Sequence, residues 1–151
     1  MSVEENLKRL NLSIPPGPEP VGNYLAYTKS NNLIFISGQL PIDANGKIIQ
    51  GKIGLDLKYH DGEKATTLAI LNVLGQLQKE TGNLNLVKRC IKITGYYNCT
   101  QNFKDHPKLL NIASDLIVNI LGESGKHARV VVGVNSLPLN AVVELETIFE
   151  V

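Results

Sequence analysis

Apolar residues recur along the chain with two different periods, which separate the expected helices from the expected strands. Between 109 and 121 they follow an i, i+3, i+4, i+7 pattern, which predicts an amphipathic helix that ends at Gly122 or Gly125. A denser apolar segment, 62–81, predicts a second helix, with Gly82 in the place of a C-cap glycine. Its apolar residues cover a wide arc, so this helix is expected to be covered on more than one side.

Strand-like segments are short, rich in β-branched and aromatic residues, and bounded by turn residues. They are expected at 24–27, 33–36, 87–97, 128–134 and 142–151. The first two flank a polar Lys-Ser-Asn-Asn sequence and predict a β-hairpin. The last two are joined by a short segment around Pro138 and predict a second hairpin. A turn is expected at 43–46, after which the chain extends or flanks the sheet.

The resulting order of elements, β-β-(β)-α-β-α-β-β, predicts an α+β fold. It is a two-layer sandwich in which a mixed β-sheet carries two helices on one face. The other sheet face then has no helix, although Val130-Val-Val132 presents β-branched side chains to both faces. A second copy of the chain is expected to supply the missing layer.

The chain divides into an N-terminal arm, 1–20, and a single domain, 21–151. Within the arm, 4–10 is long enough for one short helix. The segment 11–22 holds four prolines, which cannot donate a ladder of backbone hydrogen bonds, so it is expected to be extended. A length of 151 residues suits one hydrophobic core rather than two.

Composition and charge exclude several classes of function. Hydrophobic residues make up 43% and charged residues 19%, which is typical of globular domains. Fifteen Lys and Arg against fourteen Asp and Glu give a net charge of +1, so nucleic-acid binding is not expected. The longest apolar run, around 68–77, is far short of the roughly 20 residues that a membrane span needs. The acidic, polar start has no signal-peptide pattern, which predicts a cytoplasmic protein.

The cysteines and histidines show no spacing that is typical of a metal site. Cys90 and Cys99 form no Cys-x-x-Cys pair, and His60, His106 and His127 lack the i, i+4 spacing of a zinc-binding helix. In a reducing compartment both cysteines are expected to remain thiols. The sequence therefore predicts neither a metal centre nor a covalent nucleophile.

Charged residues interrupt two of the expected strands. Arg129 opens an otherwise valine-rich strand, and Glu144 and Glu146 lie within the strand expected to pair with it. Such charges must be paired or face a cavity. Because a guanidinium suits a carboxylate and a Glu can position water, one interpretation is a site for a small carboxylate substrate. The alternative is a cross-strand salt bridge, or glutamates on the solvent face of an edge strand.

Short blocks of sequence carry a resemblance to a known family. They are Tyr24, Leu33-Ile-Phe-Ile-Ser-Gly-Gln-Leu-Pro41, Ala128-Arg129, Leu137-Pro138 and Val143-Glu-Leu-Glu146. Together they resemble the RidA (YjgF) family, also called endoribonuclease L-PSP, over about 20–151. The resemblance implies a chorismate-mutase-like fold and a homotrimer with a β-barrel core, with ligand sites in the clefts between subunits.

The resemblance also implies an activity. Members of the family hydrolyse small 2-imino or 2-enamino acids to 2-keto acids and ammonia without a cofactor or a metal. By motif, Arg129 would bind the substrate carboxylate, Glu144 would hold the attacking water, and Tyr24 would line the pocket. The implied substrate-binding set is Ser37, Gly38, Asn111 and His127.

Some positions depart from the family pattern and indicate a divergent branch. His127 stands where the archetype has proline, and Val131 stands where deaminating members often carry cysteine. The segment 48–63 is longer than the archetype's, and the proline-rich arm is additional. These departures leave open a non-catalytic trimer that binds small carboxylate metabolites or a protein partner. An endoribonuclease is disfavoured because the chain has neither a positive field nor an evident pair of histidines.

Overall fold

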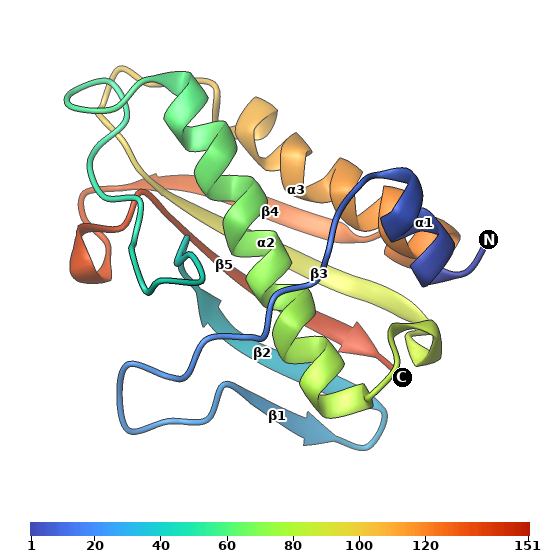
Figure 1. The fold of residues 1–151 in the computed structure, drawn as a ribbon. Coiled ribbons are helices and arrows are strands. Elements are labelled where there is room, and N and C mark those ends of the chain that lie inside the picture. Colours follow the sequence, from blue (N-terminus) through green and yellow to red (C-terminus); the bar gives the residue numbers. More distant parts are fainter.

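A computed structural model describes all 151 residues and shows one five-stranded sheet (Figure 1). The strands are β1 (Tyr27–Ser30), β2 (Leu33–Gln39), β3 (Arg89–Asn98), β4 (Ala128–Val134) and β5 (Val143–Glu150). They lie in the order β1-β2-β5-β3-β4. Only β3 and β4 are parallel, and the other neighbours are antiparallel, so the sheet is mixed as predicted.

Two long helices, α2 (Tyr59–Thr81) and α3 (His106–Leu121), lie side by side on one face of this sheet (Figure 1). A short helix, α1 (Val3–Arg9), packs on α3, where the side-chain amide of Asn6 donates to the carbonyl of Ile120 at 3.0 Å. Three 3₁₀ turns complete the fold: η1 (Leu84–Leu86), η2 (Gly122–Gly125) and η3 (Pro138–Asn140). The opposite sheet face has no helix. The predicted two-layer α+β sandwich is confirmed.

Residues at the helix ends explain where the helices begin and stop. Gly82 follows α2 with φ 69°, and Gly122 follows α3 with φ 65°, a region that favours glycine because it has no Cβ. The helix α2 begins at Tyr59, earlier than the apolar pattern indicates. Its first turn is capped by the Asp61 carboxylate, which accepts from the backbone N–H of Lys58 at 2.8 Å.

The first hairpin is shifted along the chain from its predicted place. The strand expected at 24–27 is β1, Tyr27–Ser30, and a two-residue turn at Asn31 and Asn32 joins it to β2. Asn31 has φ 52°, a conformation that asparagine tolerates better than most residues. The shift leaves 24–26 outside the sheet, where Tyr24 and Ala26 line a cavity.

The second predicted hairpin is wrong, because β3 lies between β4 and β5. Strand β5 pairs with β2 along one edge and with β3 along the other, so β4 can pair only with the free edge of β3. The helix α3 carries the chain from β3 to β4 as a crossover between parallel strands. Arg129 on β4 and Glu144 on β5 are therefore not cross-strand neighbours.

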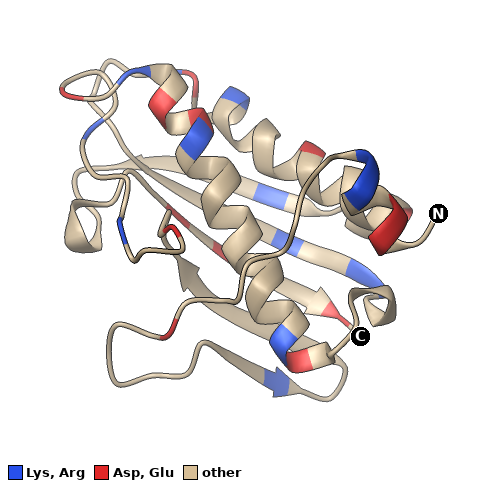
Figure 2. Ribbon diagram, viewed as in Figure 1, with Lys and Arg blue, Asp and Glu red and all other residues tan.

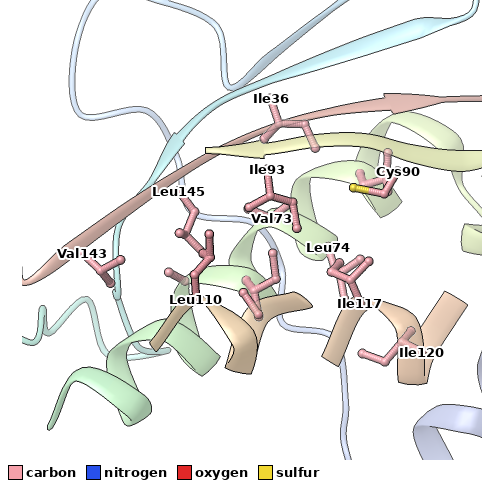
Figure 3. Packing of buried hydrophobic residues seen from close by; sticks show 14 of the residues in the cluster. Ile36, Val73, Leu74, Cys90, Ile93, Leu110, Ile117, Ile120, Val143 and Leu145 are labelled. Atoms are coloured by element: carbon pink, nitrogen blue, oxygen red, sulfur yellow. The ribbon is translucent and has the colours of Figure 1, made fainter. Parts of the chain in front are cut away.

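The hydrophobic core lies between the sheet and the two long helices (Figure 3). Ile93 of β3 and Leu145 of β5 point towards Val73 of α2 and Leu110 of α3, and all four side chains are fully buried. Alternate residues of β5 point the other way, which places Glu144 and Glu146 on the face without helices. The prediction that α2 is covered on more than one side is confirmed: the sheet and α3 cover one side, and the extended arm covers another.

The open sheet face carries exposed apolar side chains. Phe35 is 40% exposed, Val130 45% and Val132 42%. Charged residues of both signs are intermixed over the strands and helices rather than gathered by sign (Figure 2). None of the helices combines the length and the hydropathy needed to cross a bilayer. No group of three or more His, Cys, Asp or Glu side chains is placed to hold a metal ion.

Candidate functional site

A cavity of about 320 Å³ lies between the N-terminal arm, the end of β2 and the start of β5. Twelve residues line it, and they include Tyr24, Gly38 and Glu144, three of the residues implicated from the sequence. Most of the surface that lines the cavity is apolar. A concave, mostly apolar site with a few convergent polar groups is typical of small-molecule binding.

Gly38 and Glu144 lie in direct contact at the floor of this cavity. A Cβ at position 38 would lie 2.8 Å from the carboxyl carbon of Glu144, which is closer than Cβ atoms normally approach. Gly38 also falls where the pairing of β2 with β5 is irregular, between Ile36 and Gln39. The missing side chain and the bulge together allow the carboxylate to lie against the backbone of β2.

The environment of Glu144 disfavours its negative charge. Burial raises the pKa of its carboxyl above the ordinary value, and the neighbouring negative charge of Glu146 raises it further. No cation forms an ion pair with Glu144. Glu146 instead accepts a hydrogen bond from the hydroxyl of Tyr96 at 3.0 Å. Glu144 is therefore a stronger base than an ordinary surface carboxylate and is free to interact with a ligand or a water molecule.

Tyr24 and Ser37 lie near each other, but only Tyr24 lines the cavity. Tyr24 is half-exposed and lines the cavity. Ser37 does not line it: its hydroxyl donates to the carbonyl of Leu25 at 2.6 Å, and its N–H donates to the carbonyl of Ala26 at 2.9 Å. These bonds hold the segment that follows Tyr24 against β2.

Two buried amide side chains, Gln39 and Gln76, support the cavity and were not implicated from the sequence. The Nε2 of Gln76 on α2 donates to the carbonyl of Pro18 at 2.6 Å and to Oε1 of Gln39 at 3.3 Å. Gln39 in turn donates to the carbonyl of Ser37 at 2.9 Å. In the sequence, the only indication of these buried amides is that two polar residues, Asn72 and Gln76, interrupt the apolar run of α2.

Arg129 lies in a second polar cluster, beside α3. Its side chain donates to the hydroxyl of Ser114 at 3.1 Å and to the carbonyl of Pro107 at 3.4 Å, and it has no carboxylate partner. Nδ1 of His127 donates to the carbonyl of Gly125 at 2.6 Å, and Nε2 of His127 lies 2.9 Å from the Ser114 hydroxyl. Since a carbonyl can only accept, a neutral His127 carries its proton on Nδ1 and accepts from Ser114.

Asn111 joins this second cluster by its place on α3. It follows Pro107 by four residues and precedes Ser114 by three, so the three share one face of the helix. Its side chain is exposed and forms no hydrogen bond within the chain. Arg129, His127 and Asn111 therefore gather around α3, with Ser114, which the sequence did not single out.

The two clusters do not meet within one chain. Arg129 is the register partner of Ile93 on β3, and Ile93 is the register partner of Thr147 on β5. Strand β3 therefore separates Arg129 from the strand that carries Glu144. Arg129 bonds to α3 and so lies on the helix side of the sheet. Glu144, three residues from Thr147, faces the other side. The salt bridge between Arg129 and Glu144 considered from the sequence is absent, because it presumed that β4 and β5 are adjacent.

Comparison with known proteins places this fold in a family. The model of the YjgF/chorismate-mutase-like endoribonuclease family matches residues 4–150. The chain belongs to the YjgF family. It is similar to Protein TCP17 of Trypanosoma cruzi, with 37% identity over 149 residues, which cover 98% of this chain and 93% of that protein. The solved structure of a Shewanella oneidensis MR-1 protein superposes with a TM-score of 0.95 at 33% identity and covers 100% of both chains.

A more distant YjgF relative carries the name of an activity. It is the 2-iminobutanoate/2-iminopropanoate deaminase of Dermatophagoides farinae, which is 26% identical over 140 residues and covers 91% of this chain and 92% of that protein. The family match and the superposed Shewanella structure confirm the expected YjgF-like fold.

Proposed function

We propose that this YjgF-family chain is an imine deaminase, which hydrolyses small 2-imino acids to 2-keto acids and ammonia. The observation that carries the proposal is the Glu144 carboxylate, which lies over Gly38 in a cavity, has no cationic partner and has a raised pKa. Arg129, exposed and without a carboxylate partner, supports it as the group that binds the substrate carboxylate. The deaminase from Dermatophagoides farinae supports the same chemistry.

The active site is proposed to form between copies of the chain, most simply in a homotrimer. Strands in a sheet are about 4.8 Å apart, so β4 and β5, with β3 between them, are about 10 Å apart. Arg129 and Glu144 also face opposite sides, and a molecule of a few atoms cannot touch both within one chain. The open sheet face exposes the apolar side chains of Phe35, Val130 and Val132, and packing another subunit on this face would remove them from water.

The reaction needs one water molecule and no oxidant or reductant. The water oxygen forms a bond to C2 of the imino acid, one water proton goes to a base, and the C=N electron pair moves to nitrogen, which takes a proton and becomes an amine. The resulting carbinolamine then collapses. Its hydroxyl loses a proton and becomes the keto oxygen, while the C–N bond breaks and nitrogen takes a proton and leaves as ammonia.

Glu144 suits the proton transfers of both the addition and the collapse. When ionised it accepts a proton from the attacking water, and its raised pKa makes it a better acceptor than an ordinary carboxylate. Once protonated, it can return the proton to the departing nitrogen. The backbone of Gly38, which a side chain would otherwise obstruct, is open to the same cavity.

Arg129 suits the other end of the substrate. A guanidinium can donate two parallel hydrogen bonds to a carboxylate, and this fixes both the position and the orientation of C2. Ser114 and the carbonyl of Pro107 hold the guanidinium in place without neutralising its charge. Asn111 lies on the same face of α3 as a further substrate-binding residue, and Tyr24 borders the Glu144 half of the site. Both ring nitrogens of His127 bond within the chain, so His127 acts on the site through Ser114.

The direct test follows 2-iminobutanoate, generated from threonine by a dehydratase, in the presence of semicarbazide, which traps the imine that has not yet hydrolysed. We expect the wild-type protein to slow trapping. Glu144→Gln should lower kcat by about 10²-fold or more, and Arg129→Ala should act mainly through KM. Arg89→Ala is the matched control, because this exposed arginine lies on β3 and pairs with Glu150. Equal trapping with and without wild-type protein would overturn the proposal.

A second function is favoured by one observation. Val131, two residues after Arg129 on the same side of β4, places an apolar side chain beside the proposed carboxylate-binding group. A binding protein for small carboxylate metabolites needs Arg129 but no further reactive group. It would bind 2-oxobutanoate in an Arg129-dependent manner while leaving the lifetime of 2-iminobutanoate unchanged.

A further inference from the structure

The extended segment 12–21 consists of the second half of the arm and Val21. It packs on α2 where two glycines, Gly17 and Gly75, face each other. A Cβ at Gly75 on the helix would lie 2.8 Å from the backbone nitrogen of Gly17 on the arm. A Cβ at Gly17 would lie 2.8 Å from the backbone nitrogen of Gln76. The two backbones are therefore in direct contact, and a side chain at either position would push the arm away from the helix.

Two side chains of α2 hold the arm in this seat. Gln76 donates to the carbonyl of Pro18 at 2.6 Å, and Lys79 donates to the carbonyl of Gly17 at 2.6 Å. The Lys79 ammonium also pairs with the Glu19 carboxylate at 3.2 Å. The Oε1 of Gln76 is buried without a hydrogen-bond partner, which is unfavourable for stability.

Beyond this seat, the arm forms one wall of the cavity that contains Glu144. Residues 18–21 all line it. The only charged group among them, the Glu19 carboxylate, is 88% exposed and paired with Lys79. The wall that remains is apolar and consists of Pro18, Pro20 and Val21. Because prolines restrict the backbone, this wall is stiff.

We propose that residues 18–21 are the specificity-determining wall of the Glu144 cavity, and that they favour substrates with aliphatic side chains over those with acidic side chains. This inference rests on the proposed function, since it assigns the side-chain end of the same substrate. An acidic side chain against this wall would lose water without gaining a partner. An acidic side chain would also face the negative charge of Glu144. Lys79 is a positioning residue, which acts on the substrate through the arm.

The first test places a positive charge on the wall. Val21→Lys is compared with Leu86→Lys, because Val21 is 61% exposed and Leu86 58%, and Leu86 lies in η1, outside the cavity. The kcat/KM values for 2-iminobutanoate and 2-iminoglutarate are measured with each protein. We expect Val21→Lys to shift their ratio about tenfold towards the acidic substrate. Leu86→Lys should leave the ratio unchanged.

The second test loosens the seat and leaves the apolar residues of the wall, Pro18, Pro20 and Val21, unchanged. Lys79→Ala removes the bond to Gly17 and the pair with Glu19, and Lys64→Ala is the control, an exposed lysine on the same helix. We expect Lys79→Ala to raise KM for 2-iminobutanoate several-fold, with kcat within about twofold of the wild type. Lys79→Arg, which keeps the donors, should restore KM.

Binding of the keto acids separates a failure of this inference from a failure of the proposed function. Calorimetry with 2-oxobutanoate and 2-oxoglutarate needs no turnover. Suppose the wild type hydrolyses no imine but binds 2-oxobutanoate more tightly than 2-oxoglutarate, and Val21→Lys reverses this preference. The result would support the proposed role of residues 18–21 and contradict the proposed deaminase activity. A preference ratio that is unchanged in Val21→Lys, by turnover or by binding, overturns the wall. Absence of both turnover and binding overturns both proposals.

Discussion

The Glu144 carboxylate occupies the space that a side chain at Gly38 would fill. The contact joins β5 to β2 at the irregular point of their pairing, and it lies at the floor of the cavity. Gly38 is not required here for a left-handed backbone, because its φ is not positive. Its role is steric: it leaves room for a carboxylate.

Gly38→Ala is expected to displace Glu144 and to lower imine hydrolysis by about 100-fold, because small displacements of catalytic groups have effects of this size. The backbone at position 38 is compatible with alanine, so the thermal unfolding midpoint should change little. Turnover of 2-iminobutanoate and circular dichroism measure the two effects. In a Glu144→Ala background, Gly38→Ala should cause no further loss of activity. Additive losses would show that Gly38 acts independently of Glu144.

The pH profile should depend on Glu146, because its charge contributes to the raised pKa of Glu144. The base must be ionised, so kcat/KM falls as the pH drops through the pKa of Glu144. Glu146→Gln removes the neighbouring negative charge and lowers that pKa, which should move the acidic limb of the profile to lower pH. Glu123→Gln, a change of the same type in η2, should leave the limb in place. An acidic limb that does not move in Glu146→Gln would contradict this coupling.

The same raised pKa predicts how the free energy of unfolding depends on pH. Between the ordinary pKa and the raised pKa of Glu144, the native state binds more protons than the unfolded state, so stability falls as the pH rises through this window. Glu144→Gln removes this contribution and should be more stable than the wild type above the window. Urea unfolding at a series of pH values measures the difference. Equal slopes for the two proteins would rule out an unfavourably buried charge at Glu144.

Most of the fold could be predicted from local patterns, and the exception is informative. Helix periodicity and glycines such as Gly82 locate α2 and α3 because these signals lie within the elements themselves. The hairpin expected around Pro138 is wrong because strand order depends on pairing between distant segments. In this sheet β5 pairs with β2 and β3, and nothing in the local sequence of β4 shows that its own partner is β3.

The candidate site could likewise be predicted where it depends on sequence motifs, but not where it depends on strand order. Tyr24, Gly38 and Glu144 meet in one cavity, as the motifs indicated, whereas Arg129 lies across the sheet because β3 separates its strand from that of Glu144. The buried amide of Gln76 was visible only as an interruption of an apolar run. Its partners on the arm and on β2 are distant in sequence, so the pattern could not reveal its role.

Asn72 should matter for stability as well as for the shape of the cavity. Its buried amide donates to the carbonyls of Leu40 and Ile42 at 3.0 and 2.9 Å, and both residues line the cavity. Asn72→Leu leaves the carbonyl of Ile42 without a partner and the carbonyl of Leu40 with only the backbone N–H of Ile42, so it should lower the free energy of unfolding by about 2 kcal/mol. Gln78→Leu, at an exposed position of the same helix, should stay within about 0.5 kcal/mol of the wild type. Denaturant unfolding compares the variants, and similar losses in both would point to helix propensity instead.

Complementation between impaired variants, assayed with 2-iminobutanoate far below KM, tests whether Arg129 and Glu144 act from different copies of the chain. Arg129→Ala retains Glu144, and Glu144→Gln retains Arg129, so each protein alone has no complete site. If the site lies between subunits, unfolding and refolding the two together in equal amounts should produce complete sites where an intact Glu144 meets Arg129 of the partner subunit. Random mixing gives about one quarter of the wild-type activity. Refolding each variant separately and then mixing briefly is the control, because subunits that do not exchange cannot form the mixed site. Activity absent from the co-refolded mixture, while wild-type protein refolds to full activity, would mean that the two residues do not share a site across an interface.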